Sequence, residues 1–326
     1  MNIREALEGR NKPLVLDGGF GTMVQRYGLR EEDFRGCRYR DIPGMLLGNN
    51  EMLNLTRPDL VSDIYRAYVQ AGVDILTANT FSANSVSQAD YGCEHLVREM
   101  NREAVRLARK AFADSGREGF VIATIGPTNK SLSISPDMND PACRSVTFDH
   151  LAQSYAEQIE VLAEEGVDAI LLETIFDTLN AKAGIYAMQE VTDKTGKDIP
   201  LMLSVTVNDT AGRLLSGQTL EAFLISVSHA PLLSIGLNCS FGADQMLPVL
   251  RNLHRMMADM AGEKGGKFTS CHPNAGLPNS MGQYDVSPEQ FAQSVKPMLD
   301  EGLVDIIGGC CGTTPEHIKA VVDICR

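Results

Sequence analysis

Three cysteines are the residues best suited to chemistry. Cys239 stands alone, whereas Cys310 and Cys311 are adjacent and lie between glycines. Three thiolates with no redox requirement favour zinc, and three protein ligands leave the fourth tetrahedral position to water or a substrate. Zinc held by three thiolates is a weak Lewis acid for carbonyl chemistry, but it binds an incoming thiol as the nucleophilic thiolate. The cysteines therefore predict a catalytic zinc site that activates a substrate thiol.

Two carboxylates and a glycine-rich turn form a second candidate group. Asp17 and Glu173 each end an apolar run, and Gly18 and Gly19 follow the aspartate directly. The carboxylates can hold an ammonium group, while backbone amides of the turn can receive a carboxylate. Together with Asn79, which follows another apolar run, they predict a site for a small zwitterionic thiol. Local roles stay open: Asp17 in an Asx-turn, and Glu173 in an ion pair with a nearby cation.

The elements that must bring these residues together alternate between strand and helix. Such alternation implies a parallel sheet with right-handed crossovers, and eight units favour a closed (β/α)8 TIM barrel, one domain over residues 1–326. Its functional residues lie at the carboxyl ends of the strands, where the cysteines and carboxylates fall. We expect strands at 13–17, 73–78, 119–125, 168–173, 200–206, 232–238, 267–272 and 303–308. We expect helices near 58–71, 93–115, 148–165, 177–195, 218–228, 243–262, 287–300 and 314–324.

A weak internal repeat supports the barrel. AGVDILTAN begins at residue 71, EGVDAILLE at 165 and EGLVDIIGG at 301. The glycines are expected to end helices in the left-handed conformation, and the aspartates to bond backbone at the bottom of the barrel. The connections 18–57 and 126–146 are long, and long loops in compact domains are usually functional.

The composition is that of an ordinary globular protein. Of 326 residues, 44% are hydrophobic and 22% charged, which excludes disordered, collagen-like and coiled-coil chains. A formal net charge of −13 disfavours nucleic acids and anionic membrane surfaces as partners. No apolar run approaches the roughly 18 residues of a membrane helix, and the first dozen residues lack the apolar core of a secretory signal. Eight cysteines are too few for a disulfide scaffold, and we expect a cytoplasmic protein.

Motifs along essentially the whole chain resemble the homocysteine S-methyltransferase family. The stretch SISPDMNDPACRSVTFD at 133–149 is similar, more specifically, to the homocysteine-binding module of cobalamin-dependent methionine synthases. The family motifs are DGGFGTMVQ at 17–25, GNNEMLNLTRPDLV at 48–61, GVDILTANTFSAN at 72–84, LLETIFDTLNAKA at 171–183, GLNCS at 236–240, PNAGLPN at 273–279 and GGCCGTTPEHI at 308–318.

The resemblance implies a methyl transfer to the thiol of L-homocysteine that gives L-methionine. It implies zinc bound by Cys239, Cys310 and Cys311, with the homocysteine sulfur as a further ligand and with substrate contacts from Asp17 and Glu173. Asn274 is the expected fourth ligand when substrate is absent. Methylcobalamin on another module or subunit is the expected methyl donor, which makes cobalamin- and folate-binding modules partners in cis or in trans. The pair Cys271-His272 departs from the aromatic and small residues expected there, and its role stays open.

Three alternatives remain at this point. Within the same class, a stand-alone enzyme would use S-adenosylmethionine, S-methylmethionine or a betaine-like donor, although the SPDMNDP loop argues against it. From a different class, the barrel could hold a structural zinc with four protein ligands, or act as a thiol redox sensor through Cys310 and Cys311. A phosphate-binding barrel is disfavoured because the two cysteines occupy the turn after the eighth strand.

Overall fold

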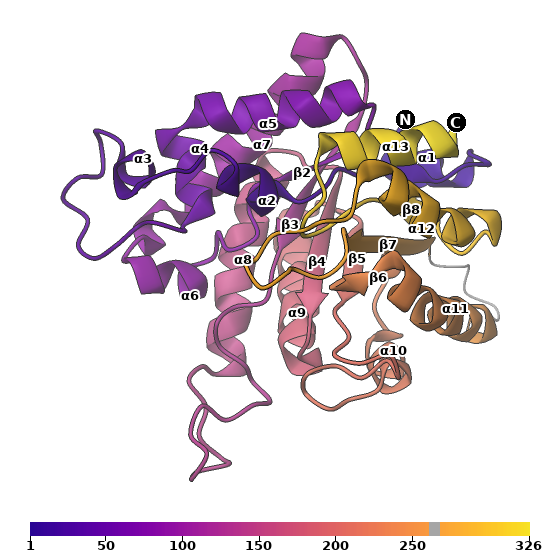
Figure 1. Cartoon of the computed structure of the whole chain (residues 1–326). Coiled ribbons are helices and arrows are strands. Elements are labelled where there is room, and N and C mark those ends of the chain that lie inside the picture. Colours follow the sequence, from indigo (N-terminus) through magenta and orange to yellow (C-terminus); the bar gives the residue numbers. More distant parts are fainter. Residues whose placement is uncertain (261–267) are drawn as a thin grey trace.

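A single sheet of eight parallel strands forms the core of the computed structural model, which describes residues 1–260 and 268–326 (Figure 1). The strands pair in the order β1-β8-β7-β6-β5-β4-β3-β2, and an isolated bridge between Leu16 and Ile75 brings the two edges together. The predicted (β/α)8 barrel is therefore confirmed. The strands are β1 (Leu14–Val15), β2 (Ile75–Ala78), β3 (Phe120–Ile125), β4 (Ala169–Ile175), β5 (Leu201–Val205), β6 (Leu232–Gly242), β7 (Phe268–Asn274) and β8 (Ile306–Ile307).

One major helix follows each strand along the chain, as predicted, and the helices surround the sheet. The predicted helix at 93–115 begins with a 3-10 turn (Glu94–Leu96) before its α-helical part. Residues 261–262 of the helix predicted at 243–262, and residue 267 of a predicted strand, lie outside the described residues. The major helices are α5 (Pro58–Ala71), α7 (Val97–Ser115), α8 (Phe148–Glu164), α9 (Thr178–Thr195), α10 (Leu220–Val227), α11 (Ala243–Met260), α12 (Pro288–Asp300) and α13 (Pro315–Cys325).

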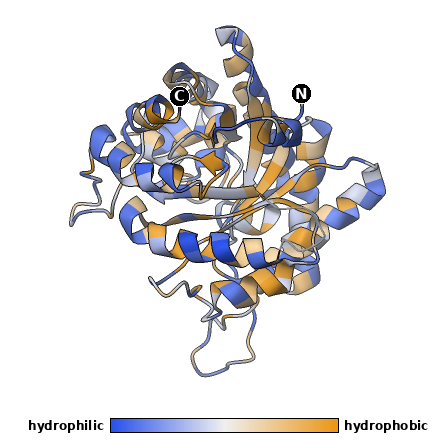
Figure 2. Cartoon of the chain, turned by 90° about the vertical axis from the view of Figure 1, so that its right-hand side faces the viewer, coloured by the Kyte–Doolittle hydropathy of each residue, from blue (hydrophilic) through white to orange (hydrophobic). Residues whose placement is uncertain are grey.

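Two apolar layers hold the barrel together. The larger lies between the sheet and the helices, and the smaller fills the barrel interior with side chains such as Leu14, Ile122 and Leu171. The short helix α1 (Ile3–Glu8) adds Ile3 and Leu7 to the interior cluster and so closes the lower end. Figure 2 shows the resulting distribution, with apolar residues concentrated on the strands and hydrophilic residues on the outer sides of helices.

The bottom of the barrel is held by the three repeat segments. Gly72, Gly166 and Gly302 all have positive φ and end helices, as predicted. Because glycine has no Cβ, it adopts this conformation without steric cost. The carboxylates of the three repeats accept hydrogen bonds from the backbone of an adjacent strand, which confirms their structural role. The pairs are Asp74 with Val15 N (3.0 Å), Asp168 with Val121 N (2.7 Å) and Asp305 with Thr269 N (2.8 Å).

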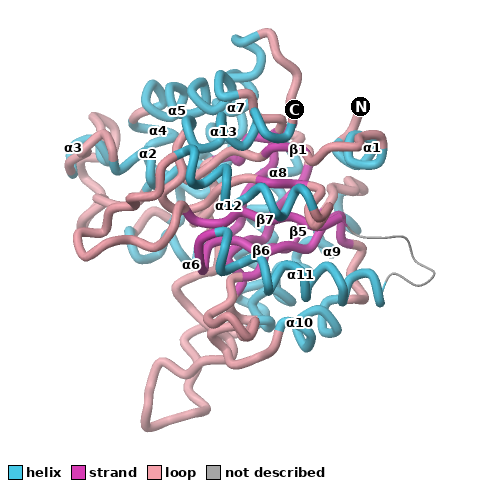
Figure 3. Tube along the Cα trace, turned by 45° about the vertical axis from the view of Figure 1, so that its right-hand side comes forward, coloured by secondary structure: helices cyan, strands magenta, loops and turns pink. Residues whose placement is uncertain are grey.

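Two long connections leave the upper end. Residues 18–57 contain α2 (Phe20–Gln25), α3 (Glu31–Arg35), a 3-10 turn (Asn50–Met52) and α4 (Leu53–Thr56). The β3–α8 connection contains no helix or strand and extends away from the barrel, as Figures 1 and 3 show. Its base is fixed at Asp177, whose carboxylate accepts from the hydroxyls of Ser131 (2.5 Å) and Ser133 (2.7 Å).

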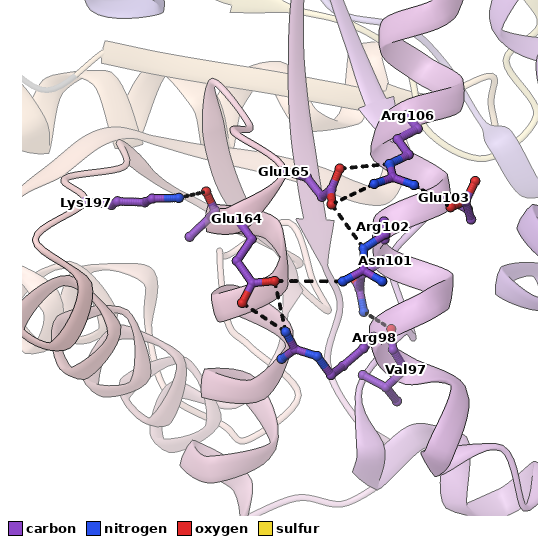
Figure 4. A network of polar contacts seen from close by, with 10 residues as sticks. Val97, Arg98, Asn101, Arg102, Glu103, Arg106, Glu164, Glu165 and Lys197 are labelled. Carbon is purple, nitrogen blue, oxygen red and sulfur yellow. Dashed lines mark hydrogen bonds and ion pairs between the residues drawn. The ribbon is translucent and has the colours of Figure 1, made fainter.

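Ion pairs join α7 to the end of α8 on the outer surface (Figure 4). Glu164 pairs with Arg98 at 2.9 Å, and Glu165 pairs with both Arg102 and Arg106 at 3.1 Å. Exposed pairs of this kind each contribute at most about 1 kcal/mol, so the network adds modestly to the apolar packing beneath it. Among the described helices, none has the length and apolar character needed to cross a membrane.

Candidate functional site

A cavity of about 470 Å³ opens at the carboxyl ends of the strands. Residues from β2, β3, β4, β6 and β7 and from the turns after β1 and β8 meet there, although they are far apart in the sequence. Its lining includes all of the predicted site residues except Asn274, which lies beside it. The predicted residues in the lining are Asp17, Gly18, Gly19, Asn79, Glu173, Cys239, Cys310 and Cys311, and His272, Thr77 and Tyr284 line it as well.

The three predicted sulfurs converge. The Sγ atoms of Cys239, Cys310 and Cys311 all lie within 4.8 Å of one another, and those of Cys239 and Cys311 are 3.9 Å apart. Tetrahedral zinc with bonds of about 2.3 Å to sulfur needs sulfurs about 3.8 Å apart, so the cluster fits this metal. Among the described residues, no fourth cysteine, histidine or carboxylate joins the group. A tetrahedral ion held by these three sulfurs would keep one further coordination position, for Asn274 or for a ligand from outside.

Three residues at or beside the cavity have a strained backbone conformation. Thr174, Cys239 and Ser240 have φ values of 57°, 58° and 60°, in the left-handed region that residues with a Cβ rarely adopt. Asn238 holds the strained segment of β4, because its side chain accepts from Thr174 N at 2.9 Å and donates to the Thr174 hydroxyl at 2.9 Å. Ser240 accepts from Val207 N at 2.9 Å. Bulges at the ends of β4 and β6 accompany this conformation.

Because of these bulges, two strands end later than the sequence predicts. β4 continues to Ile175 and β6 to Gly242. Glu173, predicted as the last residue of its strand, and Cys239, predicted directly after its strand, therefore both lie within their strands. Asn274 is likewise the last residue of β7. At the other two site strands the prediction was too long, because β1 and β8 contain only two residues each before the glycine-rich turns begin.

The three thiols do not titrate alike. Hydrogen bonds from the side chains of Cys310 and Cys311 lower the pKa of the Cys239 thiol, and the Asn274 side chain adds to this effect. The pKa of Cys310 is raised, and the largest cause is its side-chain hydrogen bond with Cys239. A negative charge on Cys239 is therefore stabilised by its neighbours, which suits a site that receives a cation.

Asn274 lies directly behind the cysteines and is buried. Its side-chain oxygen accepts from the backbone N–H of Cys311 at 3.1 Å, and its side chain also bonds the sulfur of Cys239. Asn274 thus connects Cys239 on β6 with Cys311 in the turn after β8. A role of Asn274 as the fourth metal ligand stays a prediction.

Two carboxyls face the same cavity, Asp17 buried and Glu173 half-buried. Asp17 is 3% exposed and accepts from the backbone N–H of Thr77 at 2.8 Å and from its hydroxyl at 2.9 Å. Burial raises the pKa of Asp17 to about 7, despite these bonds. Burial and the charge of Asp17 together raise the pKa of Glu173 to about 8. Among the described residues neither has an ion-pair partner, and the causes that shift their pKa values include no cation.

The glycines after Asp17 are required by close packing. A Cβ on Gly18 would lie 2.6 Å from the hydroxyl oxygen of Thr313, and a Cβ on Gly19 would lie 2.7 Å from the carbonyl oxygen of Cys310. The Gly19 amide already donates to the Thr313 hydroxyl at 3.0 Å. A short helix, α2, begins directly after this turn.

Asn79 lines the cavity while its amide supports the surrounding loop. Its Nδ2 donates to the carbonyl oxygen of Asn50 at 2.8 Å and to the Asn54 side chain at 2.9 Å. Both amide protons are therefore used within the protein. Direct contact with a substrate remains a prediction for this residue.

Two further residues of the site lack a predicted role. Tyr284, in the loop after β7, hydrogen-bonds the Cys311 side chain and lies over Gly312, where a Cβ would be 2.3 Å from its ring. His272 lies inside the barrel, where burial lowers its pKa to about 4 and keeps it neutral. Its neighbour Cys271 faces outward, with Sγ 3.2 Å from the Met246 sulfur. Strand alternation alone could have separated these two, since successive side chains point to opposite faces.

Comparisons with known proteins identify the fold and the family of the chain. The oxidised form of the homocysteine methyltransferase MmuM from Escherichia coli has a TM-score of 0.74 at 20% identity, covering 99% of this chain and 100% of that one. Its metallated form has a TM-score of 0.73 at 20% identity, covering 98% of each chain. These similarities show a shared fold. The profile of the family described as homocysteine S-methyltransferase matches residues 14–325, and the chain belongs to that family.

Proposed function

We propose that this protein transfers a methyl group to the thiol of L-homocysteine and so makes L-methionine. The observation that carries the proposal is the meeting of three cysteine sulfurs and the carboxyls of Asp17 and Glu173 in one cavity. Cys239, Cys310 and Cys311 would hold zinc, which when bound keeps a coordinated thiol in its thiolate form. The absence of a fourth protein ligand among the described residues favours this role over a structural zinc.

The other residues of the cavity would orient the amino acid. Asp17 and Glu173 would receive its ammonium group, because a nearby cation offsets the burial that now disfavours their ionised forms. Backbone amides of the turn that follows Gly18 and Gly19 would receive the substrate carboxylate, although the Gly19 amide itself donates to Thr313. In the transfer, the sulfur lone pair forms the new C–S bond, the donor keeps the electron pair of the broken bond, and the thiol proton passes to water.

The proposed methyl donor is methylcobalamin on another module or subunit, with folate- and cobalamin-binding modules as partners. The β3–α8 connection carries the SPDMNDP sequence that supports this choice, and it extends away from the barrel. S-methylmethionine and related onium donors are the alternative. Incubation of the zinc-loaded chain and homocysteine with each donor separates them: turnover with an onium compound and none with methylcobalamin would overturn the proposed donor.

Cysteine substitutions test the metal site. Cys239→Ser and Cys310→Ser are expected to abolish stoichiometric zinc binding and methyl transfer. Cys271→Ser is the matched control, because this thiol lies on the outer face of β7 and is expected to leave the zinc content at one ion per chain. Elemental analysis gives the metal content, and zinc-edge spectroscopy with and without homocysteine reports the ligand sphere. Full zinc occupancy and turnover in both site variants would refute the proposal, and an edge spectrum blind to homocysteine would favour a structural zinc.

A further inference from the structure

His272 has a buried nitrogen without a hydrogen-bond partner in the described part of the chain. The residue is 2% exposed and lies on the inner side of β7, in the lining of the cavity that contains Asp17 and Glu173. Its Nε2 atom is buried and has no hydrogen-bond partner among residues 1–260 and 268–326. Buried polar atoms nearly always have a partner, and an exception inside a ligand cavity indicates that the ligand supplies it.

The polar neighbours on the sheet are already occupied. Asn238 lies opposite His272 in the β6–β7 register. The Asn238 side-chain oxygen accepts from Thr174 N at 2.9 Å and from the Ser204 hydroxyl at 2.8 Å, and its amide donates to the Thr174 hydroxyl at 2.9 Å. The side-chain oxygen of Asn274, two residues along β7, accepts from the backbone of the cysteine pair. Neither amide therefore serves the imidazole.

The two carboxyls of the cavity leave one position on an ammonium group unfilled. An ammonium group has three N–H donors, and Asp17 and Glu173 accept two of them in the proposed complex. A third carboxylate would add a further buried negative charge, which is strongly unfavourable. A neutral imidazole offers one acceptor nitrogen and adds no charge.

We propose that Nε2 of His272 accepts the third hydrogen bond from the ammonium group of the bound amino acid. His272 is in this role a positioning and specificity residue, and it selects thiols that carry an α-amino group. The inference rests on the proposed function. The competing partner is a buried water between Nε2 and the hydroxyl of Ser270, which also has no partner among the described residues.

Two variants and two thiols test the assignment without a methyl donor. His272→Phe keeps an aromatic ring and removes both nitrogens, whereas His272→Gln keeps an acceptor at a similar distance from the backbone. The zinc-loaded wild type and both variants are titrated calorimetrically with L-homocysteine and with 4-mercaptobutanoate, which lacks the amino group. The titrations give the affinity of each protein for each thiol. Zinc content and thermal unfolding confirm that each variant is metallated and folded.

We expect His272→Phe to weaken homocysteine binding by about tenfold or more, the loss typical of a hydrogen bond to a charged group. The affinity for 4-mercaptobutanoate should change less than about twofold, and His272→Gln should recover part of the loss. An equal loss for both thiols would assign Nε2 to a buried water and overturn the inference, as would unchanged homocysteine affinity. If wild type itself does not bind homocysteine, the proposed function fails, and the inference falls with it.

Discussion

Replacement of Asp17 by asparagine should make the metal-free protein more stable and a poorer binder of homocysteine. The side chain is 3% exposed and accepts hydrogen bonds from the backbone N–H and the hydroxyl of Thr77. Asparagine has the same shape and can keep an accepting oxygen toward the Thr77 amide, while the hydroxyl can reverse its role. The substitution therefore removes the buried charge with little other change.

The size of the effect follows from the pKa of Asp17, which burial raises from 3.8 to about 7. A carboxyl with a raised folded-state pKa contributes stability below its unfolded pKa and loses that contribution as pH rises through the folded pKa. The difference corresponds to a cost of about 4 kcal/mol once the folded protein ionises. The advantage of Asp17→Asn should therefore be about 4 kcal/mol at pH 8, about 2 kcal/mol at pH 5, and close to zero below pH about 4.

Urea denaturation of metal-free wild type and variant at pH 5 and pH 8 measures these differences. Asp168→Asn is the control, because this carboxylate pairs with Arg109 at 2.7 Å at the opposite end of the barrel. It should lose about 1 kcal/mol at both pH values. Homocysteine affinity of the zinc-loaded Asp17→Asn protein should fall about 10- to 100-fold, because a hydrogen bond to a charged partner is lost.

Two results would refute this reasoning. If Asp17→Asn is less stable than wild type at pH 8, or if its advantage does not change with pH, burial does not disfavour the charge. If the variant is more stable but binds homocysteine as tightly as wild type, Asp17 does not contact the ammonium group. The predicted combination identifies a residue that destabilises the free protein and stabilises the complex.

Two further predictions concern the support of the cysteines. Asn274→Ala should weaken zinc binding about 10- to 100-fold, because its side chain holds the Cys311 amide at 3.1 Å; unchanged affinity in a chelator competition would contradict this. Gly312→Ala should lower the free energy of unfolding by more than about 3 kcal/mol, since its φ is +81° and a Cβ would lie 2.3 Å from the Tyr284 ring. Gly166→Ala, with φ of +70° and nothing described within 4 Å, should lose only about 1–2 kcal/mol in urea denaturation.

The barrel and the meeting of the three sulfurs could be predicted from the sequence because both depend on chain order. Strands that alternate with helices place every strand end at one rim, so cysteines after the sixth and eighth apolar runs had to approach each other. The positive φ of the glycine before each repeat aspartate could also be predicted, because glycine adopts this conformation without steric cost. These features are local or topological, and each has a direct sequence signal.

Other features of the site depend on three-dimensional contacts and had no such signal. The left-handed conformation of Cys239 and Thr174 arises where bulged strand ends are held by Asn238, and neither residue type favours it. Tyr284 hydrogen-bonds Cys311 from a loop, where no periodic sequence pattern predicts the direction of a side chain. The isolated nitrogen of His272 became visible only when the hydrogen bonds of its neighbours were known.

The aspartate clamps at the bottom of the barrel have an evolutionary consequence. The same short turn occurs three times, each time with a carboxylate that fastens one strand to the next. Because these fasteners lie at the end remote from the cavity, the upper loops are free to diverge without loosening them. Substrate choice can thus be reshaped by exchanging loops on an unchanged base, and chimeras that swap only upper loops should keep their melting temperature while their thiol preference changes.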